Sequence, residues 1–116
     1  MVVLLADDNR LLLSVLANVL RIDGHKVLTA DSGEEALRLT QEQHPDAAII
    51  DFYMPWISGE DVARQCAQLG IPFMFLSAYD DASTRKVAHD LGAKAYLVKP
   101  AAREDLLAAL ARCAQL

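Results

Sequence analysis

The chain has 116 residues, and its 11 Lys and Arg against 16 Asp and Glu give a formal net charge of −5. With 53% hydrophobic residues, a chain of this length buries roughly 65% of its unfolded surface on folding, which excludes an intrinsically disordered protein. The acidic balance, without any basic cluster, argues against a surface that binds nucleic acid or an anionic membrane.

Targeting segments and metal-binding cysteine motifs are not expected. The first residues lack a positive region and reach Asp7 and Asp8 too soon for a signal peptide, and no apolar run approaches the ~20 residues of a membrane span. Cys66 and Cys113 lie in helix-like patterns without C-x-x-C spacing, so we expect neither a disulfide nor a zinc site. The expected location is the cytoplasm.

Short apolar runs of strand length alternate with longer segments of helical period, five of each. The runs are almost continuously hydrophobic, which is typical of strands that are covered on both faces. Regular alternation of strand and helix predicts parallel strands joined by right-handed crossovers. In chain order, the predicted strands cover residues 2–6, 26–30, 47–50, 72–76 and 95–98.

The first two helices are marked by an apolar stripe and by a capping motif. The stripe predicts that the first helix packs one face on the sheet and ends at Gly24. Ser32 and Glu35 form an S-x-x-E capping box that opens the second helix, which ends at His44-Pro45. The stripe of the first helix consists of Leu12, Val15, Leu16, Val19 and Leu20.

The last three helices have their own start and stop residues, although we find no polar N-cap for the fifth. The markers are Ser58 and Gly70 for the third helix and Asp80 or Asp81 and Gly92 for the fourth. The fifth helix is expected from about Arg103, with Cys113 and Ala114 among its inward-facing residues. Five such units favour an open sheet over an eight-fold barrel, which needs about 250 residues.

The expected fold class is α/β: a flavodoxin-like, five-stranded parallel sheet of order 2-1-3-4-5, with helices on both faces. Sheets of this kind bind their ligands at the carboxyl ends of the strands, where the strand order reverses. We therefore expect the functional residues to follow the strands directly.

Acidic residues follow two strands that are neighbours in this order. Asp7 and Asp8 come after the first strand, and Asp51 ends the third. Because three converging carboxylates repel one another, a hard cation such as Mg²⁺, which prefers carboxylate, carbonyl and water ligands, would stabilise them. Asp8 is the expected direct ligand, and Asp7 would act through water or with Lys99.

Lys99 and Ser77 add an ammonium group and a hydroxyl group to the same edge, after the fifth and fourth strands. A cation, a carboxylate, an ammonium and a hydroxyl together suit a phosphoryl group carried by the carboxylate. Asp51 is the candidate nucleophile because it stands alone on the central strand. Each residue alone would be interpreted as a cap or turn former, so the prediction depends on the combination.

Two features beside this site indicate a switch. The Lys99-Pro100 bond is a candidate for a cis peptide that would aim the lysine inward. Tyr96, on the last strand, is a candidate to alternate between buried and exposed positions as Ser77 moves.

From Val2 to about Ala114 the chain resembles the receiver domain of two-component response regulators, the CheY-like family. The landmarks are the acid pair Asp7-Asp8, the segment Asp51-Phe52-Tyr53-Met54-Pro55 continuing to Gly59, Ser77-Ala78, and the segment from Gly92 to Lys99-Pro100. The resemblance implies one receiver domain over residues 1–116. It would be a signalling domain that catalyses only its own phosphorylation and dephosphorylation, not an enzyme.

The resemblance also implies a role for each site residue. Asp51 would be the phosphoacceptor, supplied by a histidine kinase, a phosphotransfer protein or a small phosphodonor. Mg²⁺ would be held by Asp8, Asp51 and the backbone carbonyl of Tyr53, with Asp7 in the outer shell. Ser77 and Lys99 would contact the phosphoryl oxygens, and Tyr96 would rotate with Ser77.

The implied partners follow from the same resemblance. The fourth helix, fifth strand and fifth helix would form the surface for an output domain or effector protein, or for a homodimer, without direct contact to nucleic acid or membrane. Leu11 and Leu13 would mark a kinase-docking area.

Tyr53 and Tyr79 would tune the phosphate lifetime, and Ala101 departs from the large apolar residue of many relatives. The chain also looks like receivers attached to antiterminator-type RNA-binding outputs.

Three other functions compete with this interpretation. A phosphatase with an aspartyl-phosphate intermediate needs a second carboxylate two residues after the nucleophile, where this chain has Tyr53. A receiver-like binding module that works without phosphate would not need the intact set of acids, Ser77 and Lys99. A nucleotide-binding flavodoxin-like protein would need a glycine-rich phosphate loop after the first strand, where Asp7 and Asp8 stand instead.

Overall fold

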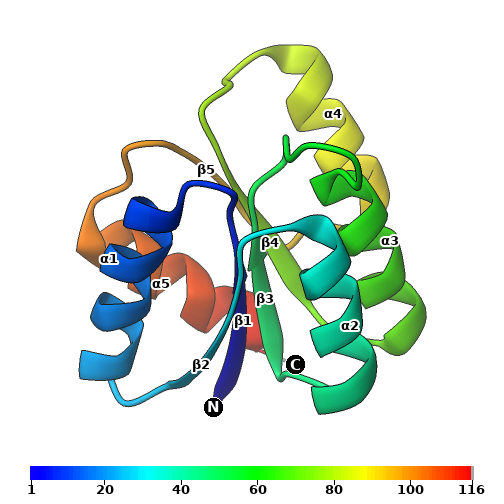
Figure 1. Cartoon of the computed structure of the whole chain (residues 1–116). Coiled ribbons are helices and arrows are strands. Elements are labelled where there is room, and N and C mark those ends of the chain that lie inside the picture. The colour runs from blue at the N-terminus through cyan, green and yellow to red at the C-terminus, as the bar shows by residue number, and fades with distance from the viewer. Residues whose placement is uncertain (116) are drawn as a thin grey trace.

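The computed structural model describes residues 1–115, along which strands and helices alternate (Figure 1). Three strands have the predicted bounds, and the other two begin one residue later than expected. The strands are β1 (Val2–Ala6), β2 (Lys26–Ala30), β3 (Ala47–Ile50), β4 (Phe73–Ser77) and β5 (Tyr96–Val98). The helices are α1 (Arg10–Ile22), α2 (Gly33–Gln43), α3 (Gly59–Leu69), α4 (Ala82–Leu91) and α5 (Arg103–Ala114).

The strands form one parallel sheet of order β2-β1-β3-β4-β5, which confirms the predicted flavodoxin-like fold. Helices α1 and α5 cover one face of the sheet, and α2, α3 and α4 cover the other (Figure 1). Strand order reverses between β1 and β3, because β1 pairs with both β2 and β3. The loops after these two strands therefore lie at the expected position for a site.

The core has two parts, one on each face of the sheet. Along β1, Leu4 and Ala6 pack towards α2 and α3, whereas Val3 and Leu5 pack towards α1 and α5. Successive side chains of a strand point to opposite faces, so a strand covered on both sides must be apolar at every position. This is the physical reason for the unbroken hydrophobic runs.

The apolar stripe of α1 is rotated relative to the prediction. The buried residues are Leu13, Leu16, Ala17 and Leu20, while Val15, which we had placed in the stripe, is 52% exposed. Leu13 is only 7% exposed and belongs to the core, so its predicted role in an exposed docking area was wrong. The helix carries two overlapping apolar stripes of helical spacing, and packing against the sheet selects one of them.

The helix ends mostly follow the predicted chemistry. Asp81, not Asp80, caps α4, and α5 begins after Ala102 without a side-chain cap. Ser32 Oγ accepts the Glu35 backbone N–H at 3.2 Å, but the Glu35 carboxylate pairs with Arg38, so the reciprocal half of this predicted capping box was wrong. A complete capping box is formed by Ser58 and Asp61 at α3.

Two remaining expectations concern cysteine chemistry and membrane spans. Cys66 and Cys113 are free and buried, in the cores on opposite faces of the sheet. Among residues 1–115, none of the helices combines the length and the apolar character needed to cross a bilayer.

Candidate functional site

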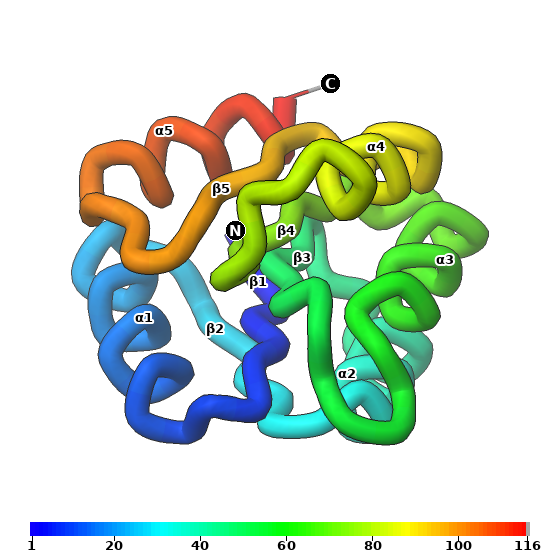
Figure 2. Tube along the Cα trace, turned by 90° about the horizontal axis from the view of Figure 1, so that it is seen from above, coloured from blue at the N-terminus to red at the C-terminus, as the bar shows by residue number. Residues whose placement is uncertain are grey.

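Three carboxylates converge where the sheet order reverses. The Asp7 backbone N–H donates to the Ala30 carbonyl at 3.0 Å, and the Asp51 backbone N–H donates to the Ala6 carbonyl at 2.8 Å, which fixes both loop starts. One carboxylate oxygen each from Asp7, Asp8 and Asp51 lies within 4.8 Å of the others. The view onto the carboxyl ends of the strands shows the loops after β1 and β3 side by side (Figure 2).

Lys99 reaches the same cluster from the end of β5. Its Nζ lies 2.7 Å from Asp7 Oδ2 and 3.4 Å from Asp51 Oδ2. The Lys99-Pro100 peptide bond, which the sequence offered only as a candidate cis peptide, is cis. When all three carboxyls are ionised, they and the one ammonium leave an excess of two negative charges, which equals the charge of one divalent cation. The oxygen-only donor set suits Mg²⁺.

The pKa values in the cluster reflect burial and crowding. Burial raises the pKa of Asp51 to about 7, and the negative charge of Asp7 adds to this rise while Lys99 opposes it. Burial would lower the pKa of Lys99, but its hydrogen bond to Asp7 and the charge of Asp51 outweigh burial and raise it. The acids thus hold the Lys99 ammonium in its charged form.

Asp7 and Asp8 have different surroundings. Asp7 is buried, and its two oxygens are engaged by Lys99 and by the Asn9 backbone N–H, the latter at 2.9 Å. Asp8 is exposed at the mouth of the cluster. This difference favours Asp8 as a direct ligand and Asp7 as an outer one. We did not predict Asn9, which also caps α1, although an Asn directly before a helix is a capping signal.

The loop between β3 and α3 is pressed against two helix N-termini. A Cβ built on Gly59 would overlap the carbonyl oxygen of Asp51 and lie 2.8 Å from Cα of Phe52. A Cβ on Gly33 would overlap the carbonyl oxygen of Ile57. Only glycine fits at both places, so the path of this loop, which carries Tyr53, is fixed by its neighbours.

We expect Gly59→Ala to displace this loop and to destabilise the protein by about 1–3 kcal/mol, the usual cost of overpacking. Chemical denaturation measures the effect. The matched control is Glu60→Ala on the next residue, whose side chain is one-third exposed and should lose only a surface ion pair. Equal stability of the Gly59→Ala variant and wild type would show that the loop can move away freely.

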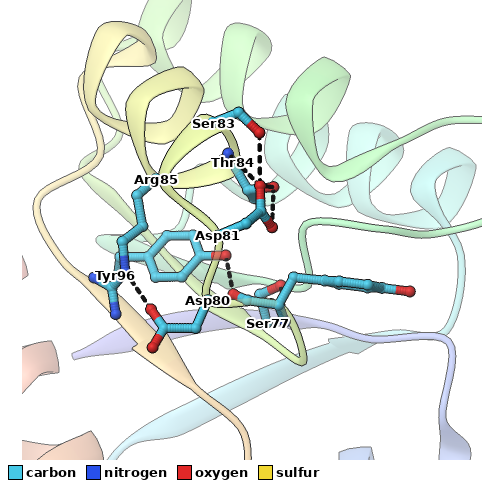
Figure 3. Close-up of polar contacts among 8 residues, drawn as sticks. Ser77, Asp80, Asp81, Ser83, Thr84, Arg85 and Tyr96 are labelled. Atoms are coloured by element: carbon cyan, nitrogen blue, oxygen red, sulfur yellow. Dashed lines mark hydrogen bonds and ion pairs between the residues drawn. The ribbon is translucent and has the colours of Figure 1, made fainter.

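Ser77 and Tyr96 are linked through the backbone of Tyr79. Ser77 is fully buried, and its Oγ accepts the Tyr79 backbone N–H at 3.1 Å. The Tyr96 hydroxyl donates to the Tyr79 carbonyl at 2.6 Å, and the Arg85 guanidinium lies 4.8 Å from the centre of the Tyr96 ring (Figure 3). Arg85 also pairs with Asp80. The Lys99 backbone N–H donates to the Ser77 carbonyl at 2.7 Å, so Ser77 and Lys99 are neighbours.

A second polar network joins the β3–α3 loop to α4. Tyr53 and Thr84 are hydrogen-bonded through their hydroxyl oxygens, 3.1 Å apart, and Thr84 Oγ1 lies 2.8 Å from both carboxylate oxygens of Asp81. The rings of Tyr53 and Tyr79 meet edge-on, with centroids 4.7 Å apart. The Asp81-x-x-Thr84 spacing is the local sequence signal of the capping contact.

Residues 3–111 match the family model described as response regulator receiver domain. The match covers most of the chain and includes every candidate site residue. The chain therefore belongs to the response regulator receiver domain family, the signalling class of two-component systems that the acid cluster and the fold indicate.

Curated relatives agree with this assignment. The chain is 40% identical over 108 residues to the response regulator MprA of Mycolicibacterium vanbaalenii and 39% identical to that of Mycobacterium leprae. In both comparisons the match covers 91% of this chain but 47% of the relative. The chain thus spans about half the length of the curated relatives it matches.

Solved structures support the fold. A response regulator receiver domain protein from Clostridium thermocellum is 32% identical, with a TM-score of 0.91 over 97% of this chain and 93% of that one. The chemotaxis protein CheY4 of Vibrio cholerae is 29% identical, with a TM-score of 0.89 over 97% of both chains. The architecture is that of a CheY-like receiver.

Proposed function

We propose that this protein is a phosphorylation-activated receiver in which Asp51 accepts a phosphoryl group in a Mg²⁺-dependent reaction. The observation that carries the proposal is the charge arrangement at the reversal of strand order: three carboxylates within 4.8 Å of one another, with one ammonium 2.7 Å from Asp7. Phosphoryl transfer depends mainly on positioning and on charge neutralisation, which is what such an arrangement supplies.

In the transfer step, an oxygen of Asp51 forms a bond to phosphorus while the phosphorus–nitrogen bond of a phosphohistidine breaks, and the released imidazole takes up a proton from water. Lys99 supplies a fixed positive charge to the phosphoryl oxygens. Asp8, Asp51 and the Tyr53 backbone carbonyl would hold Mg²⁺, and Asp7 would contact it through water. The ion, when bound, would neutralise charge on the acids and on the phosphoryl group.

The proposed switch follows from the contacts of Tyr79. If Ser77 Oγ turns to a phosphoryl oxygen on Asp51, the Tyr79 N–H loses its acceptor and the loop from Ala78 to Asp81 moves. The Tyr79 carbonyl then shifts relative to the Tyr96 hydroxyl, and the surface formed by α4, β5 and α5 changes. The contact between Ser77 and the phosphoryl group exists only in the phosphorylated protein, and this difference allows phosphorylation to shift the populations of the two conformations of the surface.

We propose a histidine kinase or a phosphotransfer protein as the phosphodonor partner. The docking area lies on α1, where Leu11 is 77% exposed, and along a groove of about 480 Å³ between α1 and the start of α5. Val15, Pro100 and Ala101 line this groove, so the small Ala101 side chain leaves room for an apolar group of the partner.

The downstream partners are also proposals. An output domain or effector protein, or a second copy of the chain, would use the α4–β5–α5 surface, because this is the surface that the proposed switch moves. The curated relatives are about twice as long as this chain. A single receiver domain over residues 1–116, in the cytoplasm, remains a prediction.

The test is phosphorylation of the purified protein with acetyl phosphate. We expect one phosphoryl group per chain with Mg²⁺, loss of labelling with excess EDTA, and release of the group by hydroxylamine, which cleaves acyl phosphates. Mass spectrometry measures all three. No labelling under any Mg²⁺ concentration would contradict the proposal and favour a binding module that works without phosphate.

A further inference from the structure

We propose that the hydrogen bond between Tyr53 and Thr84 couples the cation site to the first turn of α4, independently of phosphorylation. The inference rests on the proposed function in one respect: the Tyr53 backbone carbonyl is taken as a cation ligand. Tyr53 is then a residue whose main chain faces the cation site and whose side chain reaches the surface that is proposed to switch.

Tyr53 connects two segments that are 31 residues apart in sequence. It follows Asp51 by two residues, in the loop that lies against Gly33 and Gly59. Tyr53 is 49% exposed, yet its hydroxyl contacts Thr84, which is buried. The side chain thus crosses from the cation site to α4 instead of extending freely into solvent.

In the hydrogen bonds of this contact, each hydroxyl donates towards Asp81: Tyr53 donates to Thr84, and Thr84 donates to Asp81. Asp81 is ionised, because its hydrogen bond from Ser83 and those from Thr84 lower its pKa to about 2. The Thr84 hydroxyl therefore donates its single proton to the Asp81 carboxylate, and the Tyr53 hydroxyl donates to Thr84 Oγ1. Asp81 in turn accepts the Thr84 backbone N–H at 2.9 Å and caps α4. A chain of polarised hydrogen bonds connects Tyr53 to the helix start.

Coupling between the cation site and α4 through these hydrogen bonds must act in both directions. If Mg²⁺ fixes the backbone of Tyr53, it strengthens the contact to Thr84 and protects the first turn of α4. By thermodynamic linkage, a variant that loses the contact binds Mg²⁺ more weakly by the same factor. One hydrogen bond of this kind limits the effect to about 2- to 10-fold.

The test uses the unphosphorylated protein and Mg²⁺ alone. Mg²⁺ binding is measured by isothermal titration calorimetry. Amide hydrogen exchange of residues 82–88 is measured with and without Mg²⁺. In wild type we expect Mg²⁺ to slow this exchange by about 2- to 10-fold. Tyr53→Phe, which keeps the ring, should abolish the response and weaken Mg²⁺ binding by the same factor.

Thr84 provides the matched controls. Thr84→Val should abolish the Mg²⁺ response, Thr84→Ser should restore it, and the double variant Tyr53→Phe with Thr84→Val should lose no more Mg²⁺ affinity than either single variant. An unchanged response in Tyr53→Phe, or failure of Thr84→Ser to restore it, would overturn the coupling and leave the proposed function intact. If calorimetry detects no Mg²⁺ binding to wild type, the proposed cation site and the coupling both fail.

Discussion

Asp51→Asn is expected to abolish incorporation of phosphate from acetyl phosphate in the presence of Mg²⁺. The amide lacks the anionic oxygen that forms the acyl phosphate. The neighbouring acids have other proposed roles: Asp7 is engaged by Lys99 and the Asn9 N–H, and Asp8 is the proposed direct cation ligand. Intact-protein mass spectrometry measures the labelling, with Asp90→Asn on the surface of α4 as a charge-matched control that should label like wild type.

The same variant separates loss of chemistry from loss of fold. Because Asp51→Asn removes one of three crowded carboxylates, we expect the thermal stability of the metal-free protein to be unchanged or raised. A folded variant that still gains one phosphoryl group would show that a residue other than Asp51 is the acceptor.

Lys99→Ala is expected to separate phosphorylation from the change at the α4–β5–α5 surface. The Lys99 ammonium contacts Asp7 and Asp51 from the end of β5, so it links the proposed acceptor to the last strand. The variant removes this link and keeps the backbone hydrogen bond from residue 99 to Ser77. A hydrogen bond between charged groups contributes about 1.5–3 kcal/mol, which corresponds to roughly a 10- to 150-fold shift in the ratio of two states.

Two measurements test this variant. Labelling with acetyl phosphate should persist at a reduced rate, whereas amide chemical shifts of residues 82–98 should no longer respond to a phosphoryl mimic such as beryllofluoride. Lys94→Ala, before the start of β5, is the control and should respond like wild type. A full response in the Lys99→Ala variant would contradict the proposed role of the ammonium.

The fold could be predicted because the sequence signals that mark its strands and helices lie within each element or at its ends. Continuous apolar runs marked the strands, and glycines and capping residues marked the helix ends to within a few residues. The buried face of α1 could not be derived in this way. Leu12, Val15 and Val19 form a stripe as regular as that of Leu13, Leu16 and Leu20, and only packing against the sheet decides between them.

The candidate site was predictable to the extent that strand ends determine it. The convergence of Asp7, Asp8 and Asp51 with Lys99 follows from parallel strands and their order. The contacts of Tyr53 with Thr84 and of Tyr96 with Tyr79 depend on how a helix and a loop lie against each other, and no spacing in the sequence encodes that distance.

Position 79 connects Ser77 to Tyr96 through its amide and its carbonyl, and only its ring reaches Tyr53. Main-chain groups are present whatever the side chain, so replacement of this tyrosine leaves the link between the buried serine and the last strand in place. Under the proposed function, variation at this position is therefore free to adjust how water reaches the acyl phosphate that we propose for Asp51, while the proposed route from Ser77 to Tyr96 is retained.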